Sequence, residues 1–164
     1  MFAIVRTITY ASIFVGLLLV YLPARILAWS GITRPAVLAW PQIAGIVVAT
    51  AGALIALSCL WAFAWIGKGT PAPFDPPRKL VVRGPYRFLR NPMYVGAGLA
   101  IGGAAIFFES IQLLAFVALF LLTTHLFVLF YEEPTLQRTF GPEYEEYRRR
   151  VHRWWPSART DPSS

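Results

Sequence analysis

Apolar residues along this chain come in long runs that no charged residue interrupts. Four such runs occupy positions 7–24, 35–67, 91–108 and 111–131. A helix that crosses a bilayer needs roughly 17 to 25 predominantly apolar residues, so each run is long enough to span a membrane. The pattern predicts an all-α integral membrane protein: a helical bundle of about four transmembrane helices, followed by a short C-terminal cytosolic amphipathic helix.

Prolines and short polar turns set the expected ends of these helices. Pro41 fits the first turn of the second helix, where its missing N–H costs nothing. A tight turn at 109–110 makes the last two helices a hairpin. Gly98 and Gly102 form a small-xxx-small pair that would let a neighbouring helix approach closely. The expected helices occupy about 8–28, 42–66, 92–108 and 111–133.

The first apolar run also has features of a signal peptide, because Arg6 precedes it. It ends in Leu-Pro-Ala-Arg at positions 22–25, which does not match the small-x-small pattern of a cleavage site. We therefore expect it to be retained as the first helix.

The hydrophilic segments divide the chain into three expected regions. Residues 1–66 form an N-terminal two-helix transmembrane region. Residues 67–156 begin with an irregular, proline-rich loop, continue through the helix hairpin and end in a polar helix with an apolar tyrosine stripe. Residues 157–164 form a tail expected to be disordered. Trp154 and Trp155 are expected to anchor the end of the polar helix at the membrane interface.

Charge supports the membrane interpretation and gives a topology. Only 14% of the residues are charged, against about a quarter in soluble domains. The net charge of +7 does not indicate nucleic acid, because the basic residues flank apolar spans, where lipid headgroups account for them. Thirteen of the 15 basic residues fall on one side of the predicted bundle, and only Arg25 and Arg34 on the other. The positive-inside rule then places both termini and the middle loop in the cytosol. The single cysteine, Cys59, permits no internal disulfide.

Two polar clusters share the predicted cytosolic face. The first, at 78–94, combines basic residues with a Gly-Pro-Tyr turn and an Asn-Pro helix start. A membrane anchor requires only the basic residues and not this defined local structure. The second begins with Glu132 and Glu133. Acidic residues at a helix C-terminus are unfavourable by roughly 0.3–1 kcal/mol each, and an anionic membrane surface repels them. We therefore expect a cationic partner, either an arginine of the first cluster or a cationic ligand.

His125 is an ionisable residue inside the fourth predicted helix. Seven residues separate it from Glu132, which puts both on one face at 3.6 residues per turn. An ionisable residue within a membrane helix is a functional candidate. The alternative is a neutral histidine that hydrogen-bonds to another helix.

The two clusters together resemble a known family. The first reads Arg-x-Leu-Val-x-x-Gly-Pro-Tyr-x-x-x-Arg-Asn-Pro-x-Tyr, and the second Glu-Glu-x-x-Leu-x-x-x-Phe-Gly-x-x-Tyr-x-x-Tyr after two apolar spans. This pattern is similar to the isoprenylcysteine carboxyl methyltransferase and phospholipid methyltransferase superfamily, whose members are integral membrane methyltransferases. The resemblance covers residues 78–156, about half of the chain, and makes 67–156 the methyltransferase-like region.

The resemblance implies a methyltransferase that uses S-adenosyl-L-methionine as its cofactor and needs no metal. Carboxylate, arginine and tyrosine side chains suit the ammonium, carboxylate and sulfonium of that cofactor. Glu133 is preferred over Glu132 as the cofactor glutamate. The implied catalytic residues are Arg90, Asn91, Tyr94 and Glu133. The implied cofactor-binding residues are Arg78, Lys79, Leu80, Val81, Tyr86, Asn91, Pro92, Met93, Tyr94, Glu132 and Glu133.

The expected reaction is in-line methyl transfer to a lipophilic acceptor that enters from the bilayer between helices. His125 and Val128 are the expected substrate-binding residues. Two departures from the family pattern affect this expectation. Asn91 replaces the usual histidine and cannot take a proton at neutral pH. Protein-prenyl members carry an arginine where this chain is apolar, near Val128, which argues against a prenylcysteine substrate.

Three other functions remain open at this stage. A membrane reductase of a related fold would bind NADPH in place of S-adenosylmethionine. A non-catalytic membrane scaffold would bind no small cofactor and would tolerate Glu133→Gln. A small transporter would need an oligomer, since four helices with few intramembrane charges make a poor pathway.

Overall fold

The structure is a computed structural model that describes residues 16–62 and 80–156. Those residues form helices and connecting segments without a β-strand, so the predicted all-α class is confirmed. The beginning of the first predicted helix, the residues after position 62 in the second, most of the proline-rich loop, and the tail at 157–164 lie outside the described residues.

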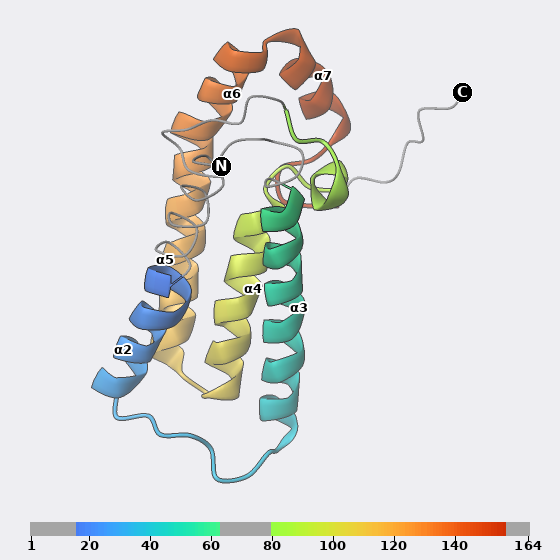
Figure 1. Cartoon of the computed structure of the whole chain (residues 1–164). Helices are drawn as coiled ribbons and strands as arrows, with labels where there is room; N and C mark the ends of the chain where they lie inside the picture. The colour runs from blue at the N-terminus through green and yellow to red at the C-terminus, as the bar shows by residue number, and fades with distance from the viewer. Residues whose placement is uncertain (1–15, 63–79, 157–164) are drawn as a thin grey trace, which may run out of the picture.

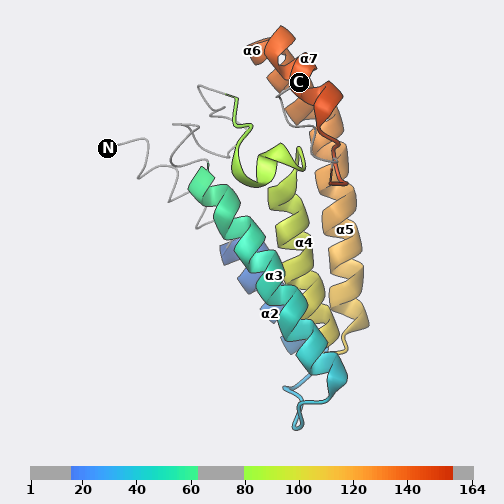
Figure 2. The ribbon, with the colours of Figure 1, turned by 90° about the vertical axis from the view of Figure 1, so that its right-hand side faces the viewer.

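Four helices lie side by side in the bundle (Figures 1 and 2). They are α2 (Leu22–Trp29), α3 (Trp40–Ala62), α4 (Pro92–Phe107) and α5 (Ile111–Phe127). The helix α6 (Glu133–Phe140) prolongs α5 beyond the bundle, and α7 (Pro142–Arg150) turns back over the end at which α4 begins. The segment 80–91 lies under this turn, so the two clusters of the sequence meet at one end of the bundle.

Two of these helices are long and apolar enough to cross a membrane. They are Trp40–Ala62 and the continuous helix Ile111–Phe140, while Gly16–Trp29 and Pro92–Phe107 are shorter apolar helices. Large apolar side chains on α3 and α5 face outward, including Leu54, Leu57, Leu119 and Leu122. Outward leucines suit contact with lipid tails, as expected for an integral membrane protein. The total of four spans remains a prediction.

Helices α3 and α4 pack backbone against backbone through glycines. A Cβ atom at Gly45 would lie 2.6 Å from the backbone nitrogen of Phe107, and one at Gly52 would lie 2.5 Å from the carbonyl oxygen of Gly96. Such distances are far below van der Waals contact, so only glycine permits this approach. Small residues at helix contacts allow close packing in membranes, where no hydrophobic force draws helices together.

Of the predicted close-packing pair, Gly98 meets a neighbouring helix and Gly102 does not. Gly98 accommodates the side chain of Leu121 on α5, 2.9 Å from the place of a Cβ atom, whereas Gly102 has no described atom within 4 Å of that place. The closest backbone contacts of α4 are instead made by Gly96 and Gly103, which face α3. Two glycines four residues apart satisfy the motif, but the rotation of the helix decides which glycines face a neighbour's backbone.

The fourth predicted helix does not end near Glu133 but continues to Phe140. Pro134 lies inside it and would clash with a carbonyl one α-turn earlier. A wider π-helical turn, η4 (Val128–Glu132), stands immediately before α6 and relieves that conflict. The same combination occurs in the first helix, where the π-turn η1 (Gly16–Tyr21) precedes Pro23.

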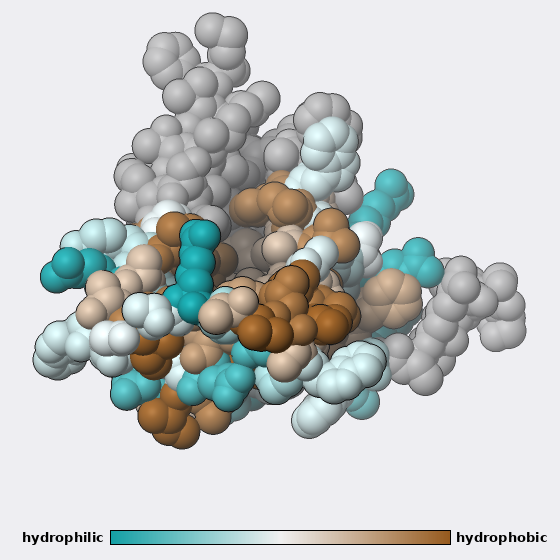
Figure 3. Space-filling model, turned by 90° about the horizontal axis from the view of Figure 1, so that it is seen from below, coloured by the Kyte–Doolittle hydropathy of each residue, from teal (hydrophilic) through white to brown (hydrophobic). Residues whose placement is uncertain are grey.

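A polar contact ties the opposite end of the bundle together. The buried side chain of Gln42 at the start of α3 donates from Nε2 to Glu109 at 2.8 Å and to the carbonyl of Phe107 at 3.3 Å. Figure 3 looks onto this end, where hydrophilic and hydrophobic side chains are mixed. Trp29 and Trp40 are 94% and 82% exposed there, as interfacial tryptophans would be.

Candidate functional site

Residues 80–82 lead into the candidate site and are fixed by two side chains that pack into different apolar clusters. Val81 packs with Tyr86 and the last turns of α3, and Leu80 packs with the tyrosines of α7. Among the described residues, no backbone hydrogen bond satisfies positions 80–82. Within the described part of the chain the segment is thus held by its side chains. Arg78 and Lys79, also expected here, lie outside the described residues.

The Gly-Pro-Tyr turn is a buried and rigid element. It forms the 3₁₀ turn η3 (Gly84–Arg87), and Gly84 adopts a φ of +62°, which favours glycine. Tyr147 of α7 donates its hydroxyl hydrogen bond to the carbonyl of Tyr86 at 2.6 Å. Burial raises the pKa of both tyrosines above the ordinary value, so each hydroxyl stays neutral. Met93, in the first turn of α4, packs against the same cluster as Tyr86.

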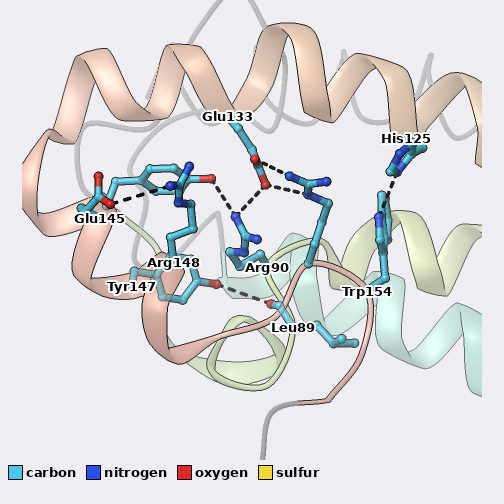
Figure 4. Close-up of polar contacts among 10 residues, drawn as sticks. Leu89, Arg90, His125, Glu133, Glu145, Tyr147, Arg148 and Trp154 are labelled. Carbon is cyan, nitrogen blue, oxygen red and sulfur yellow. Dashed lines mark hydrogen bonds and ion pairs between the residues drawn. The ribbon is translucent and has the colours of Figure 1, made fainter.

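Glu133 is held by two arginines from different parts of the chain (Figure 4). Arg90, just before α4, donates from Nη1 to Oε1 at 2.6 Å. Arg153, beyond α7, donates from Nε to Oε1 at 2.8 Å and from Nη2 to Oε2 at 2.7 Å. The hydrogen bond to Glu133 raises the pKa of Arg153, so Arg153 stays charged. The expected arginine partner from the first cluster is confirmed for Glu133.

Glu132 has a different environment from its neighbour. It accepts a hydrogen bond from the hydroxyl of Tyr94 at 3.0 Å, and no described arginine or lysine pairs with it. Two adjacent carboxyl groups therefore serve different partners: Glu133 pairs with two arginines, and Glu132 accepts a hydrogen bond from Tyr94. The sequence pattern places these two side by side but does not separate their roles.

Two buried donors at the start of α4 lack partners. Nε of Arg90 and Nδ2 of Asn91 make no hydrogen bond within the described part of the chain. Asn91 is 5% exposed and does not cap α4 with its side chain. Buried polar groups are nearly always satisfied, and each exception needs an explanation such as a ligand. Both donors belong to the Arg-Asn-Pro motif.

His125 is hydrogen-bonded, as its alternative interpretation predicted, but its partner is not another membrane helix. Its Nδ1 accepts from the indole Nε1 of Trp154 at 3.1 Å (Figure 4). In Figure 4 the side chains of His125 and Glu133 point toward the same side of their helix. The expected common face of His125 and Glu132 stays a prediction. Val128, the other expected substrate residue, is 0% exposed.

Sequence reasoning missed Arg153 and Trp154 as members of this site. Basic and tryptophan residues after a polar helix are typical of membrane anchoring, and the structure turns both inward instead. The usable signal was Glu133 itself, because a buried carboxylate needs several donors and this one accepts two N–H groups at Oε1 and one at Oε2.

Residues 40–143 match the phospholipid methyltransferase family, and the chain belongs to that family. The family resemblance of the two motifs is thereby confirmed. The chain is also similar to the nickel-cobalt-cadmium resistance protein NccN of Alcaligenes xylosoxydans xylosoxydans, with 37% identity over 78 residues. That match covers 48% of this chain and 36% of NccN, so the chain spans about a third of the length of this relative. No solved structure matches the chain.

Proposed function

We propose that this protein transfers a methyl group from S-adenosyl-L-methionine to a lipophilic acceptor that partitions into the membrane. The observation that carries the proposal is the family match over 40–143, because this stretch contains the first polar cluster and both glutamates of the second, which the fold brings together. In this assignment residues 67–156 carry the chemistry, and 1–66 serve as the N-terminal membrane region.

The side chains at the start of α4 fit the polar groups of that cofactor. The cofactor carries an ammonium, a carboxylate and ribose hydroxyls. Glu132, without a described cationic partner, suits the ammonium or a ribose hydroxyl. The unpartnered donors of Arg90 and Asn91 suit the carboxylate. The backbone at 80–82 makes no hydrogen bond to other described backbone groups, which supports the proposed contacts of Leu80 and Val81. Arg78 and Lys79 remain proposed on the motif alone.

The ion pairs favour a division of work between the two glutamates. Glu133 was expected to be the cofactor glutamate, and this assignment stays untested. Because two arginines already neutralise it, we assign Glu133 to holding Arg90 in place and Glu132 to the cationic part of the cofactor. Tyr94 orients Glu132, and its ring at the first turn of α4 can face the sulfonium.

The chain's own residues act mainly by alignment. When bound, the cofactor supplies an electrophilic methyl group, whose bond to sulfur breaks as the acceptor's lone pair forms the new bond, with the electron pair passing to sulfur. Arg90 stays protonated and Asn91 cannot take a proton, so neither acts as a base. Their part is to hold donor and acceptor in line, and a proton released by the acceptor passes to solvent. His125 and Val128 remain proposed acceptor contacts, and the site is proposed to face the cytosol.

A titration of S-adenosylmethionine into the purified chain in detergent tests the cofactor. We expect saturable heat of binding, with NADPH giving none. Incubation with methyl-labelled cofactor and membrane lipids should then move label into the organic extract. Binding of NADPH alone would favour the reductase. Binding of neither cofactor would favour the scaffold.

A further inference from the structure

Residues 151–156, here called the C-terminal strap, leave α7 in an extended conformation and run back across the end of the bundle. Val151 adopts φ −121° and ψ 126° and is buried with Leu80. The carbonyl of His152 accepts a hydrogen bond from the backbone N–H of Arg90 at 2.9 Å. The strap is therefore attached to the first cluster through main chain and packing.

The next two residues of the strap attach it to the second cluster. Arg153 forms its two-pronged ion pair with Glu133, and Trp154 donates to His125 (Figure 4). Successive strap residues thus contact Arg90, two residues before α4, then Glu133, the first residue of α6, and then His125 in the last turn of α5. The strap bridges the two motifs that the family pattern defines.

The arrangement of charges shows what the bridge does. Arg153 occupies both oxygens of Glu133, and Arg90 reaches only Oε1. A bidentate guanidinium fixes the plane of a carboxylate, which a single contact does not. With Glu133 fixed, Arg90 has one defined place, 11% exposed, beside the unpartnered Asn91 amide. The ion-paired group of Arg90, Arg153 and Glu133 thus carries a net charge of +1 and stands just before α4 through Arg90.

We propose that Arg153 is a positioning residue of the methyl-transfer site: through Glu133 it holds Arg90 in the orientation that receives the carboxylate of the cofactor. The inference rests on the proposed function. The strap is accordingly part of the site. Trp154 fixes His125 in the same way, because an Nδ1 that accepts a hydrogen bond leaves the imidazole proton of neutral His125 on Nε2.

The test measures cofactor affinity in Arg153→Ala, with Arg149→Ala as the matched control. Arg149 is exposed, carries the same charge and lies in the neighbouring α7. Loss of the charge-assisted hydrogen bonds should weaken S-adenosylmethionine binding about tenfold to a hundredfold in Arg153→Ala, while the control stays within about twofold of the wild type. Arg153→Lys keeps the positive charge but cannot bind a carboxylate through two parallel N–H groups, so its affinity for S-adenosylmethionine should lie between those of the two alanine variants.

Rescue of cofactor affinity by added guanidinium ions separates a positioning role of Arg153 from a merely structural one. Millimolar guanidinium should restore part of the affinity of Arg153→Ala, whereas sodium chloride at equal ionic strength should not. If Arg153→Ala does not fold, Arg153→Gln takes its place. Wild-type affinity in the folded variants overturns the positioning role and leaves the proposed function standing. A wild-type chain that binds no S-adenosylmethionine overturns the proposed function, and this inference with it.

Discussion

Replacing Glu133 by glutamine removes the charge that two arginines share. The carboxylate receives three N–H groups at 2.6 to 2.8 Å, and the three side chains are 10%, 11% and 25% exposed. Removing one partner of a buried ion pair costs about 3–5 kcal/mol. Glutamine keeps one acceptor oxygen and Arg153 keeps some access to water, so we expect a loss of about 2–3 kcal/mol in the free energy of unfolding.

That loss of stability is large enough to measure, and it differs from the effect expected for the neighbouring Glu132. For a chain of this length it lowers Tm by about 5–10 °C. Glu132→Gln keeps an oxygen that can accept from Tyr94 and breaks no ion pair among the described residues, so its Tm should change by less than about 2 °C. Its affinity for S-adenosylmethionine should instead fall about tenfold to a hundredfold. Glu133→Gln should also bind more weakly, through the displaced Arg90.

Thermal unfolding followed by tryptophan fluorescence in detergent, beside a cofactor titration of each variant, separates the two glutamates. The reasoning fails if Glu133→Gln melts like the wild type, because the ion pairs would then contribute nothing. It fails equally if Glu132→Gln binds the cofactor normally. In that case Glu133 would return as the cofactor glutamate.

Three further predictions use other parts of the fold. Gly52→Leu should prevent the close approach of α3 and α4 and lower Tm or abolish folding, whereas Gly102→Leu, with open space at its Cβ position, should melt within a few degrees of the wild type, by roughly the scale of surface changes. Tyr94→Phe should weaken cofactor binding about fivefold to tenfold at unchanged Tm, since it removes one hydrogen bond of roughly 1 kcal/mol to a charged group. A cysteine at the exposed Thr139 should react with an impermeant thiol reagent only from the cytosolic side, and one at the exposed Thr33 only from the other; the reverse labelling contradicts the topology.

The helices were largely predictable, because their signals are local. Pro41 and Pro92 lie in the first turns of α3 and α4, as their missing N–H groups require. The continuation past Pro134 was not predictable in the same way. A proline normally ends or kinks a helix, and the π-turn that accommodates it depends on where the glutamates must point. Its physical cause lies in tertiary contacts that local sequence does not contain.

The motifs of the site could be predicted from the sequence, but the contacts among its side chains could not. Sequence spacing brought Arg90, Asn91 and the glutamates to one end of the bundle, which the structure bears out geometrically. The inward turn of Arg153 and Trp154 depends on a buried carboxylate and a histidine that lie far away in sequence. A basic aromatic tail has the same composition whether it contacts headgroups or protein, so composition could not distinguish these outcomes.

The π-turn η4 also governs how this chain should be aligned with others. It absorbs one additional residue locally, so the helices on either side keep the directions that an uninterrupted helix one residue shorter would give them. A relative with one residue fewer between the equivalents of His125 and Glu133 can therefore present the same side chains to the same partners. Such a relative should also lack a proline after its two glutamates, because only the wide turn makes room for Pro134. An alignment gap within 128–132 thus records a change of helix type and not a change of site.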